Sequence, residues 1–243
     1  MTMTRNILFD NSSWQIAVHT GNDPDPRAKP FTNLRLSSFM AILSKIGTSN
    51  EFSTFRGAIS PSGLKGKHLL VIATRMPRLN LRTASEIAAI QRYYHNNGSV
   101  LLMTNHPFNR SPKSPMPDKD VASLLGVELV QDYIKESSPI RIPPSQLSEH
   151  PITRDIHDDI VFNTSCRIDP KSHVPIARIP NAAEPNAFAV VSRDDSKHGR
   201  FVILADSGFV ANDSTNYPGP GQFNEGANER FIENIILWLL HDL

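Results

Sequence analysis

Four apolar runs of this chain end in polar residues that could carry out acid–base chemistry. These endings are Asp10-Asn11, Thr74-Arg75, Asn105-His106 and Asp206-Ser207. The carboxyl ends of parallel strands lie along one edge of a sheet, which is where ligands bind in open α/β folds. If the runs are parallel strands, their endings bring an acid, an imidazole, amides and a guanidinium to one site. The alternative is that Asp and Asn at strand ends only cap turns and helices.

His106 is the predicted general base of this site, because an imidazole exchanges its proton near neutral pH. Asp206 or Asp10 is expected to orient its ring, and Asn105 or Asn11 to stabilise negative charge that develops on a substrate. The alternative for His106 is an ordinary histidine in a surface loop.

Several other residues are candidates for contact with the substrate. Ser207 is a candidate nucleophile if His106 reaches its hydroxyl, although the same residues are typical of a turn that ends a strand. Loop arginines could bind the carboxylate or phosphate of an anionic substrate, but most loop arginines are simply exposed. Trp14, in the first long polar stretch, is expected to cover the bound ligand. The arginines that follow two apolar runs are Arg75, Arg78, Arg82 and Arg110, of which Arg75 and Arg110 are predicted to bind the ligand.

Cysteine and metal chemistry are not expected. Cys166 is the single cysteine, which excludes an internal disulfide framework, and it is expected to be buried and unreactive. His150, His157, Asp158 and Asp159 are close in sequence, but their spacing matches no familiar metal motif, and solvated loop residues are the alternative. The sequence therefore predicts neither a metal nor a cofactor.

Composition narrows the classes of partner. The chain has 243 residues, 39% of them hydrophobic, with 25 Lys and Arg against 24 Asp and Glu. A formal net charge of +1 without blocks of like charge does not indicate binding to nucleic acid or to an anionic membrane. No apolar run approaches the roughly 18 residues that span a bilayer, and no leader sequence is recognisable. A cytoplasmic protein that binds a small polar substrate, as a monomer or a homo-oligomer, is expected.

Short apolar runs alternate with amphipathic stretches, which predicts βαβ units around a parallel sheet. Thr83 and Glu86 form a capping box at the start of one helix. Strands are predicted at 5–10, 67–74, 100–104, 187–192 and 200–205, and weaker strand signals lie at 127–130, 160–162 and 176–179. Helices are predicted at 32–46, 83–94, 121–125 and 228–240. We therefore expect a single domain over 1–243, an open and mostly parallel α/β sheet with helices on both faces and a small β-hairpin extension.

The order of these elements resembles the class I glutamine amidotransferase-like superfamily, whose fold is flavodoxin-like. The resemblance rests on the runs 7–10, 69–72 and 97–103, on His150-Pro151-Ile152-Thr153, and on an ending with 199–207 followed by Asn228 and Trp238. It is closer to the branches without amidotransferase activity, namely the gliding-motility and intraflagellar-transport domain and the trehalose-utilisation-like proteins. Asn228 is placed among the predicted ligand-binding residues.

Two classes of function follow from these observations. True amidotransferases of this superfamily carry a Cys at a tight strand-to-helix turn, where this chain has Asn105-His106 and where Cys166 does not lie. Glutamine hydrolysis by a Cys triad is therefore not expected. The first class is an enzyme that acts on a small polar molecule by hydrolysis or another acid–base reaction. The alternative class is a non-catalytic module that binds a ligand or serves as a scaffold.

Overall fold

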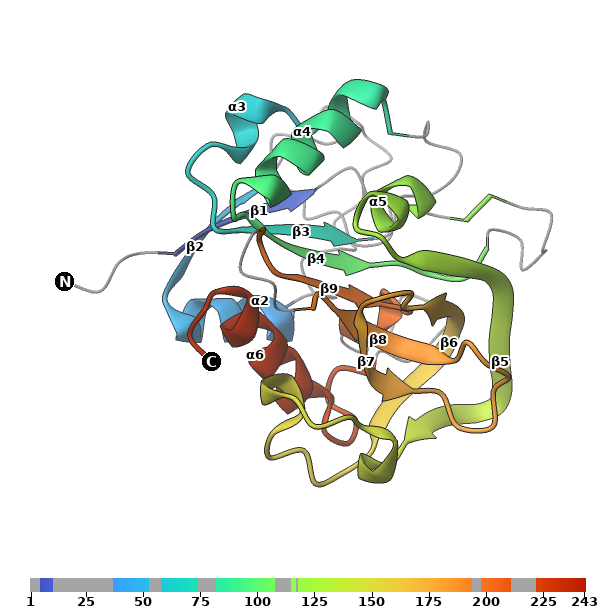
Figure 1. The fold of residues 1–243 in the computed structure, drawn as a ribbon. Coiled ribbons are helices and arrows are strands. Elements are labelled where there is room, and N and C mark those ends of the chain that lie inside the picture. Colours follow the sequence, from blue (N-terminus) through green and yellow to red (C-terminus); the bar gives the residue numbers. More distant parts are fainter. Residues whose placement is uncertain are drawn as a thin grey trace, which may run out of the picture.

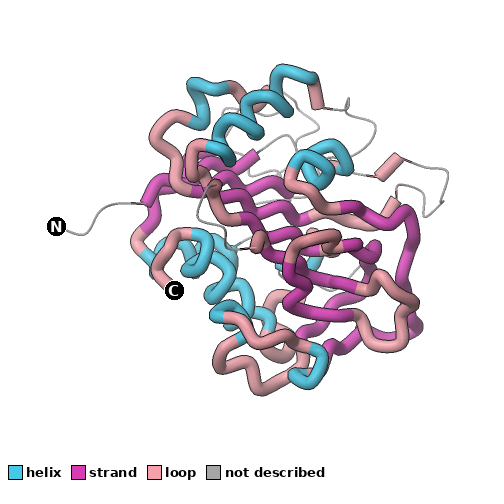
Figure 2. Tube along the Cα trace, viewed as in Figure 1, coloured by secondary structure: helices cyan, strands magenta, loops and turns pink. Residues whose placement is uncertain are grey.

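A computed structural model describes residues 5–10, 37–52, 58–73, 82–107, 115–116, 118–193, 198–210 and 222–243. One mixed sheet of nine strands runs through these residues in the order β2-β1-β3-β4-β9-β8-β6-β5, with β7 paired to β8 (Figure 1). Figure 2 shows helices lying on both sides of this sheet. The prediction of an α/β fold with helices on both faces is confirmed.

The parallel half of the sheet has the flavodoxin strand order. It comprises β2 (Thr48–Phe52), β1 (Arg5–Asp10), β3 (Leu69–Ala73), β4 (Ser99–Met103) and β9 (Phe201–Leu204), all parallel to their neighbours in this half. Numbered along the chain, these five strands have the order 2-1-3-4-5, which is one of the two common doubly wound orders. The side chains of β3, β4 and β9 are buried on both faces, as continuous apolar runs predict.

The helices separate into two layers. On one face lie α3 (Pro61–Leu64), α4 (Ala84–His95) and α5 (Lys119–Leu124), and on the other lie α2 (Ser37–Ile46) and α6 (Asn228–Leu239) (Figure 1). The predicted capping box is present, because the Thr83 hydroxyl accepts from the Glu86 backbone N–H and the Glu86 carboxylate accepts from the Thr83 N–H. Helix α4 therefore begins where the sequence predicts.

The antiparallel half is larger than the predicted small hairpin. β8 (Ala187–Val191) pairs antiparallel with β9, which confirms the hairpin itself. Beyond it lie β6 (Ile160–Asp169), β7 (Val174–Arg178) and β5 (Glu128–Ile142), a strand of 15 residues where the sequence predicts only a short strand over 127–130. Register shifts interrupt the β5–β6 ladder twice, which breaks the period-two pattern that predicts strands from sequence.

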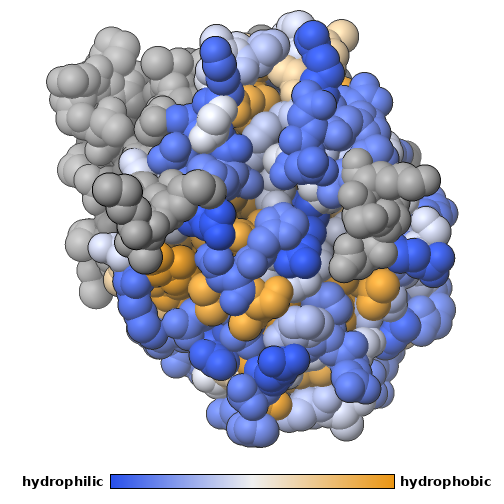
Figure 3. Space-filling view, turned by 60° about the vertical axis from the view of Figure 1, so that its left-hand side comes forward, coloured by the Kyte–Doolittle hydropathy of each residue, from blue (hydrophilic) through white to orange (hydrophobic). Residues whose placement is uncertain are grey.

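The described surface is polar around this core. Hydrophilic side chains cover most of the face seen in Figure 3, with small hydrophobic patches between them. Leu243 is the one large hydrophobic residue among the described ones that is exposed. Within the same residues, no helix is both long and apolar enough to cross a bilayer.

Candidate functional site

Asn105 and Ser207 join the ends of β4 and β9 at the carboxyl edge of the parallel half. The Asn105 amide donates to the Ser207 hydroxyl over 3.1 Å, and its oxygen accepts from the His106 backbone N–H over 2.8 Å. The Asn105 side chain therefore holds the turn after β4 in place and links this turn to the end of β9. The fold brings together three of the residues predicted to form the site.

The ring of His106 is held by a backbone carbonyl. Its Nδ1 lies 2.9 Å from the Pro107 oxygen, and because a carbonyl only accepts, Nδ1 carries the hydrogen and Nε2 has a lone pair in the neutral ring. The ring also meets Tyr133 edge-on, with centroids 4.6 Å apart. His106 is half-buried, so it has the tautomer and the partial exposure that a general base requires.

Asp206 is a buried carboxyl beside this bridge. Its side chain accepts from the Gly208 backbone N–H over 2.7 Å, and the residue is 2% exposed. Burial raises the pKa of Asp206 to about 7, although the hydrogen bond from Gly208 acts in the opposite direction. Near neutral pH this carboxyl is therefore partly protonated and can both give and take a proton.

Asp10 pairs with a buried arginine, a contact that the sequence did not predict. Its carboxylate accepts from Arg82 over 2.7 Å, and Arg82 also donates to Asp118 over 3.0 and 3.2 Å. All three side chains are at most 1% exposed. Burial alone would lower the pKa of Arg82, but the two carboxylates outweigh it and raise that pKa above its usual value. Asp10 therefore belongs to a buried ion-pair network.

This network was missed from the sequence because its members lie far apart along the chain. The sequence indicates an exposed loop arginine at Arg82, and Asp10 precedes it by 72 residues. Asp118 follows a proline-rich stretch that gives no signal of burial. Together these residues tie the end of β1 to the starts of α4 and α5. Arg82, which the sequence indicates to be an exposed loop residue, is buried and binds carboxylates of the chain itself.

The expected pairing of His106 with Asp206 is also not seen. Among the hydrogen bonds of the described residues, His106 bonds Pro107 through Nδ1 and Asp206 bonds Gly208. Ser207 is 1% exposed and contacts Asn105 instead of the imidazole. The site thus presents an imidazole and a carboxyl that are not hydrogen-bonded to each other, without a Ser–His–Asp relay among these bonds.

Asn228, the first residue of α6, holds two segments of the fold together. Its amide oxygen accepts from the Val161 N–H, and its nitrogen donates to the Val161 and Gln222 carbonyls over 2.6–2.8 Å. The residue is completely buried. These bonds fasten the start of α6 to β6, so the geometry gives Asn228 a structural role and does not favour the predicted ligand contact.

The His150-Pro151-Ile152-Thr153 stretch is structural as well. His150 caps the short 3-10 helix Pro151–Thr153 by accepting from the Ile152 N–H, and its ring packs on Trp238. Asn234 of α6 donates to the carbonyls of Ile152 and Arg154. The motif that carries part of the family resemblance therefore positions the last helix.

Five of the remaining predicted residues lie outside the described part of the chain: Asn11, Trp14, Arg75, Arg78 and Arg110. Cys166 is fully buried with its Sγ 3.9 Å from the Ala205 carbonyl, and burial, followed by nearby Asp132 and Asp206, raises the pKa of its thiol. No group of three or more His, Cys, Asp or Glu side chains suited to a metal ion occurs in the described ranges.

Comparisons with known proteins support the fold and no more. No protein-family model matches the chain, and no curated protein matches its sequence. Among solved structures, the mmIFT52 N-terminal domain is similar with a TM-score of 0.69 and 13% identity over 96% of this chain and 97% of that one. A ThuA-like protein from Bacteroides uniformis has a TM-score of 0.54 and 13% identity over 97% and 91% of the two chains.

A GMP synthase component from Thermoplasma acidophilum is similar at a TM-score of 0.51, with 10% identity over 98% of this chain and 97% of that one. The three structures together support a flavodoxin-like α/β fold for the chain. They extend the resemblance seen in the sequence at the level of fold, since identities this low carry no information on chemistry.

Proposed function

We propose that the chain is a small-molecule enzyme that uses acid–base catalysis at the carboxyl edge of its parallel strands. The observation that carries the proposal is the Asn105 bridge, which places His106 beside the end of β9, where Asp206 and Ser207 lie. His106 is the base, because its neutral ring has the Nε2 lone pair. Asp206 is the second proton-transfer group, and Asn105 stabilises negative charge on the substrate.

The proposed reaction is a hydrolysis or a related proton-transfer reaction of a small polar, anionic substrate. A covalent thiol step is not part of it, because Cys166 is buried and its pKa is raised. General acid–base groups contribute roughly 10²- to 10⁴-fold to a rate. Loss of either group is therefore expected to lower turnover by at least about 100-fold.

The test uses wild type, H106A and D206N on a panel of p-nitrophenyl esters and phosphates and on a metabolite mixture followed by NMR. Asn in place of Asp206 keeps an acceptor for the Gly208 N–H, so folding is retained. H157A and E149Q, both at exposed positions, are the matched controls. Turnover that is lost in the first two variants and kept in the controls supports the enzyme. Turnover that survives H106A and D206N excludes this assignment.

A non-catalytic binding or scaffolding module is the second candidate. The Arg82 network favours it, because the carboxylates of Asp10 and Asp118 bind an arginine of the chain itself. It is also favoured by the similarity of the whole chain to an N-terminal domain, that of mmIFT52. If wild type turns over nothing in the panel while a protein partner co-purifies with it, this candidate replaces the enzyme.

A further inference from the structure

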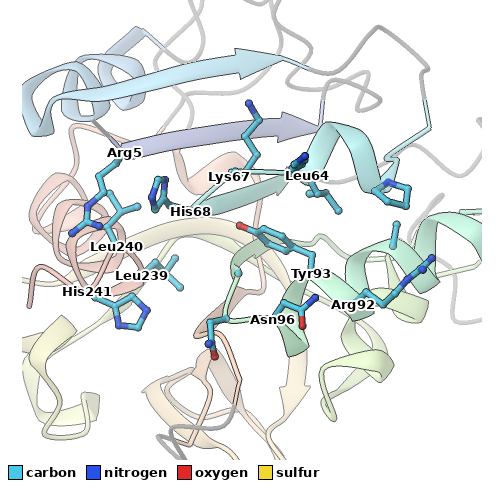
Figure 4. Close-up of a pocket in the computed structure, with 16 residues that line it drawn as sticks. Arg5, Leu64, Lys67, His68, Arg92, Tyr93, Asn96, Leu239, Leu240 and His241 are labelled. Carbon is cyan, nitrogen blue, oxygen red and sulfur yellow. The ribbon is translucent and has the colours of Figure 1, made fainter. Parts of the chain in front are cut away.

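A cavity lies at the edge of the sheet opposite the proposed site. Its volume is about 450 Å³, within the usual size range of small-molecule pockets. Its wall comes from the start of β1, the loop between α3 and β3, the end of α4 and the residues that end α6 (Figure 4). This is the amino edge of the parallel strands, whereas the site proposed above lies at the carboxyl edge.

The charge of this cavity has one sign. The cationic side chains that line it are Arg5, Lys65, Lys67 and Arg92. The imidazoles of His68 and His241 line it as well, and the Nδ1 of His68 accepts from the Asn6 N–H over 3.0 Å. None of the described residues in its wall is an Asp or a Glu, although Asp242 nearby pairs with Arg5 over 2.9 Å. An overall charge of +1 does not explain such a concentration, so the cavity is electrostatically suited to an anion.

Tyr93 lines the same cavity and carries a buried hydroxyl. The residue is 9% exposed, and its hydroxyl has no hydrogen-bond partner among the described residues. In Figure 4 its ring extends from α4 among the labelled residues, with the oxygen turned toward the side on which His68 lies. Burial raises the pKa of the phenol, so it remains a neutral donor. A buried hydroxyl without a partner costs free energy, and a bound acceptor would remove that cost.

The backbone holds the Tyr93 ring in this position. A Cβ at Gly98 would lie 2.3 Å from atoms of the ring, so the ring packs directly on the Gly98 backbone. The Gly98 N–H also donates to the Tyr93 carbonyl over 2.9 Å. The hydroxyl is therefore fixed within the cavity wall.

We propose that this cavity binds a small organic anion with an apolar body, and that Tyr93 donates a hydrogen bond to its carboxylate or phosphate. The basic side chains neutralise the charge, with exposed Lys65 and Arg92 at the rim. Leu64, Ala89 and Leu239, all buried, provide the apolar part of the wall. This site does not depend on the enzyme proposed above.

The test titrates ¹⁵N-labelled protein with phenyl phosphate and with benzoate, and uses benzyl alcohol as the uncharged analogue. We expect saturable shifts at the amides of Lys67, His68, Asn96 and Gly98 with a Kd below about 10 mM for one or both anions, and at least ten-fold weaker binding of benzyl alcohol. Y93F is expected to weaken anion binding at least five-fold while its thermal midpoint stays equal or rises, since it removes an unpaired hydroxyl. R154A, an exposed arginine elsewhere, is the control and is expected to bind as wild type does.

Three outcomes would overturn the proposal. The first is no saturable shift with either anion up to 10 mM, and the second is shifts that map away from the cavity. The third is unchanged affinity in Y93F when its spectrum shows a native fold. Phenyl phosphate and benzoate separate the two headgroups, because one carries a phosphate and the other a carboxylate.

Discussion

The buried carboxyl of Asp206 is expected to make the stability of this protein fall as the pH rises through the neutral range. Burial raises the pKa of Asp206 from 3.8 to about 7 in the native state. Between these values the native chain keeps a proton that the unfolded chain has released. Because the native state then binds more protons, its contribution to the free energy of unfolding decreases with increasing pH. D206N removes the titrating group and keeps the shape of the side chain.

The magnitude follows from the two pKa values. One pKa unit corresponds to ~1.36 kcal/mol, so the complete difference is at most ~4 kcal/mol. Between the pKa of the unfolded chain and pH 5, about one unit of this difference is lost, and the remaining two units, roughly 3 kcal/mol, are lost by pH 8. For a chain of this size 1 kcal/mol changes the thermal midpoint by about 2–4 °C. The midpoint of D206N relative to wild type should therefore rise by roughly 5–10 °C between pH 5 and pH 8.

The assay is thermal unfolding of wild type, D206N and the exposed control E149Q at pH 5, 6, 7 and 8. E149Q replaces an acid by an amide at an exposed position, so it measures the effect of this replacement when the side chain is not buried. A difference between D206N and wild type that stays constant over this range would refute the argument, because it would give Asp206 the same pKa in both states.

The other predictions concern burial and close packing. R82M removes the cation that contacts two buried carboxylates and is expected to cost ~3–5 kcal/mol, which urea or thermal unfolding measures. Cys166 is completely buried, so its thiol should react with Ellman's reagent only at the rate of unfolding, and fast labelling of the native protein would contradict this. G199A places a Cβ 1.9 Å from the Gly98 carbonyl oxygen and is expected to cost ~1–3 kcal/mol, whereas a thermal midpoint equal to wild type would show that this approach is not tight.

The sequence predicted four of the five strands of the parallel half, β1, β3, β4 and β9, because local signals determine them, whereas β2 (Thr48–Phe52) was not predicted. The run Leu69–Ala73 is apolar throughout, as strands buried on both faces are, and the Thr83–Glu86 capping box fixes the start of α4. The antiparallel half has weaker local signals. β5 is long, carries Pro139 and pairs through two register shifts, so its pattern does not repeat with a period of two. Pairing with β6 stabilises it, and that pairing is not visible in a local window.

The candidate site was predicted in part for the same reason. Strand ends locate Asn105, His106, Asp206 and Ser207, because topology alone brings the ends of neighbouring parallel strands together. Which carboxylate meets which cation depends on contacts across many residues, as for Arg82 and Asp10. Side-chain pairing at a site is thus the part that a single sequence leaves open, while the position of the site is fixed by the order of strands.

Helix α4 carries charges of opposite sign at its two ends. Glu86 lies in its first turn near the acidic network, and Arg92 and His95 lie in its last turn at the amino edge. The helix dipole favours this distribution of charge, so Arg92 beside the amino-edge cavity has a structural explanation that needs no ligand. The dipole does not explain why the buried hydroxyl of Tyr93 lacks a partner among the described residues. Substitution of the basic side chains would weaken anion binding under either explanation, and Y93F is therefore the variant that decides between a built site and a helix end.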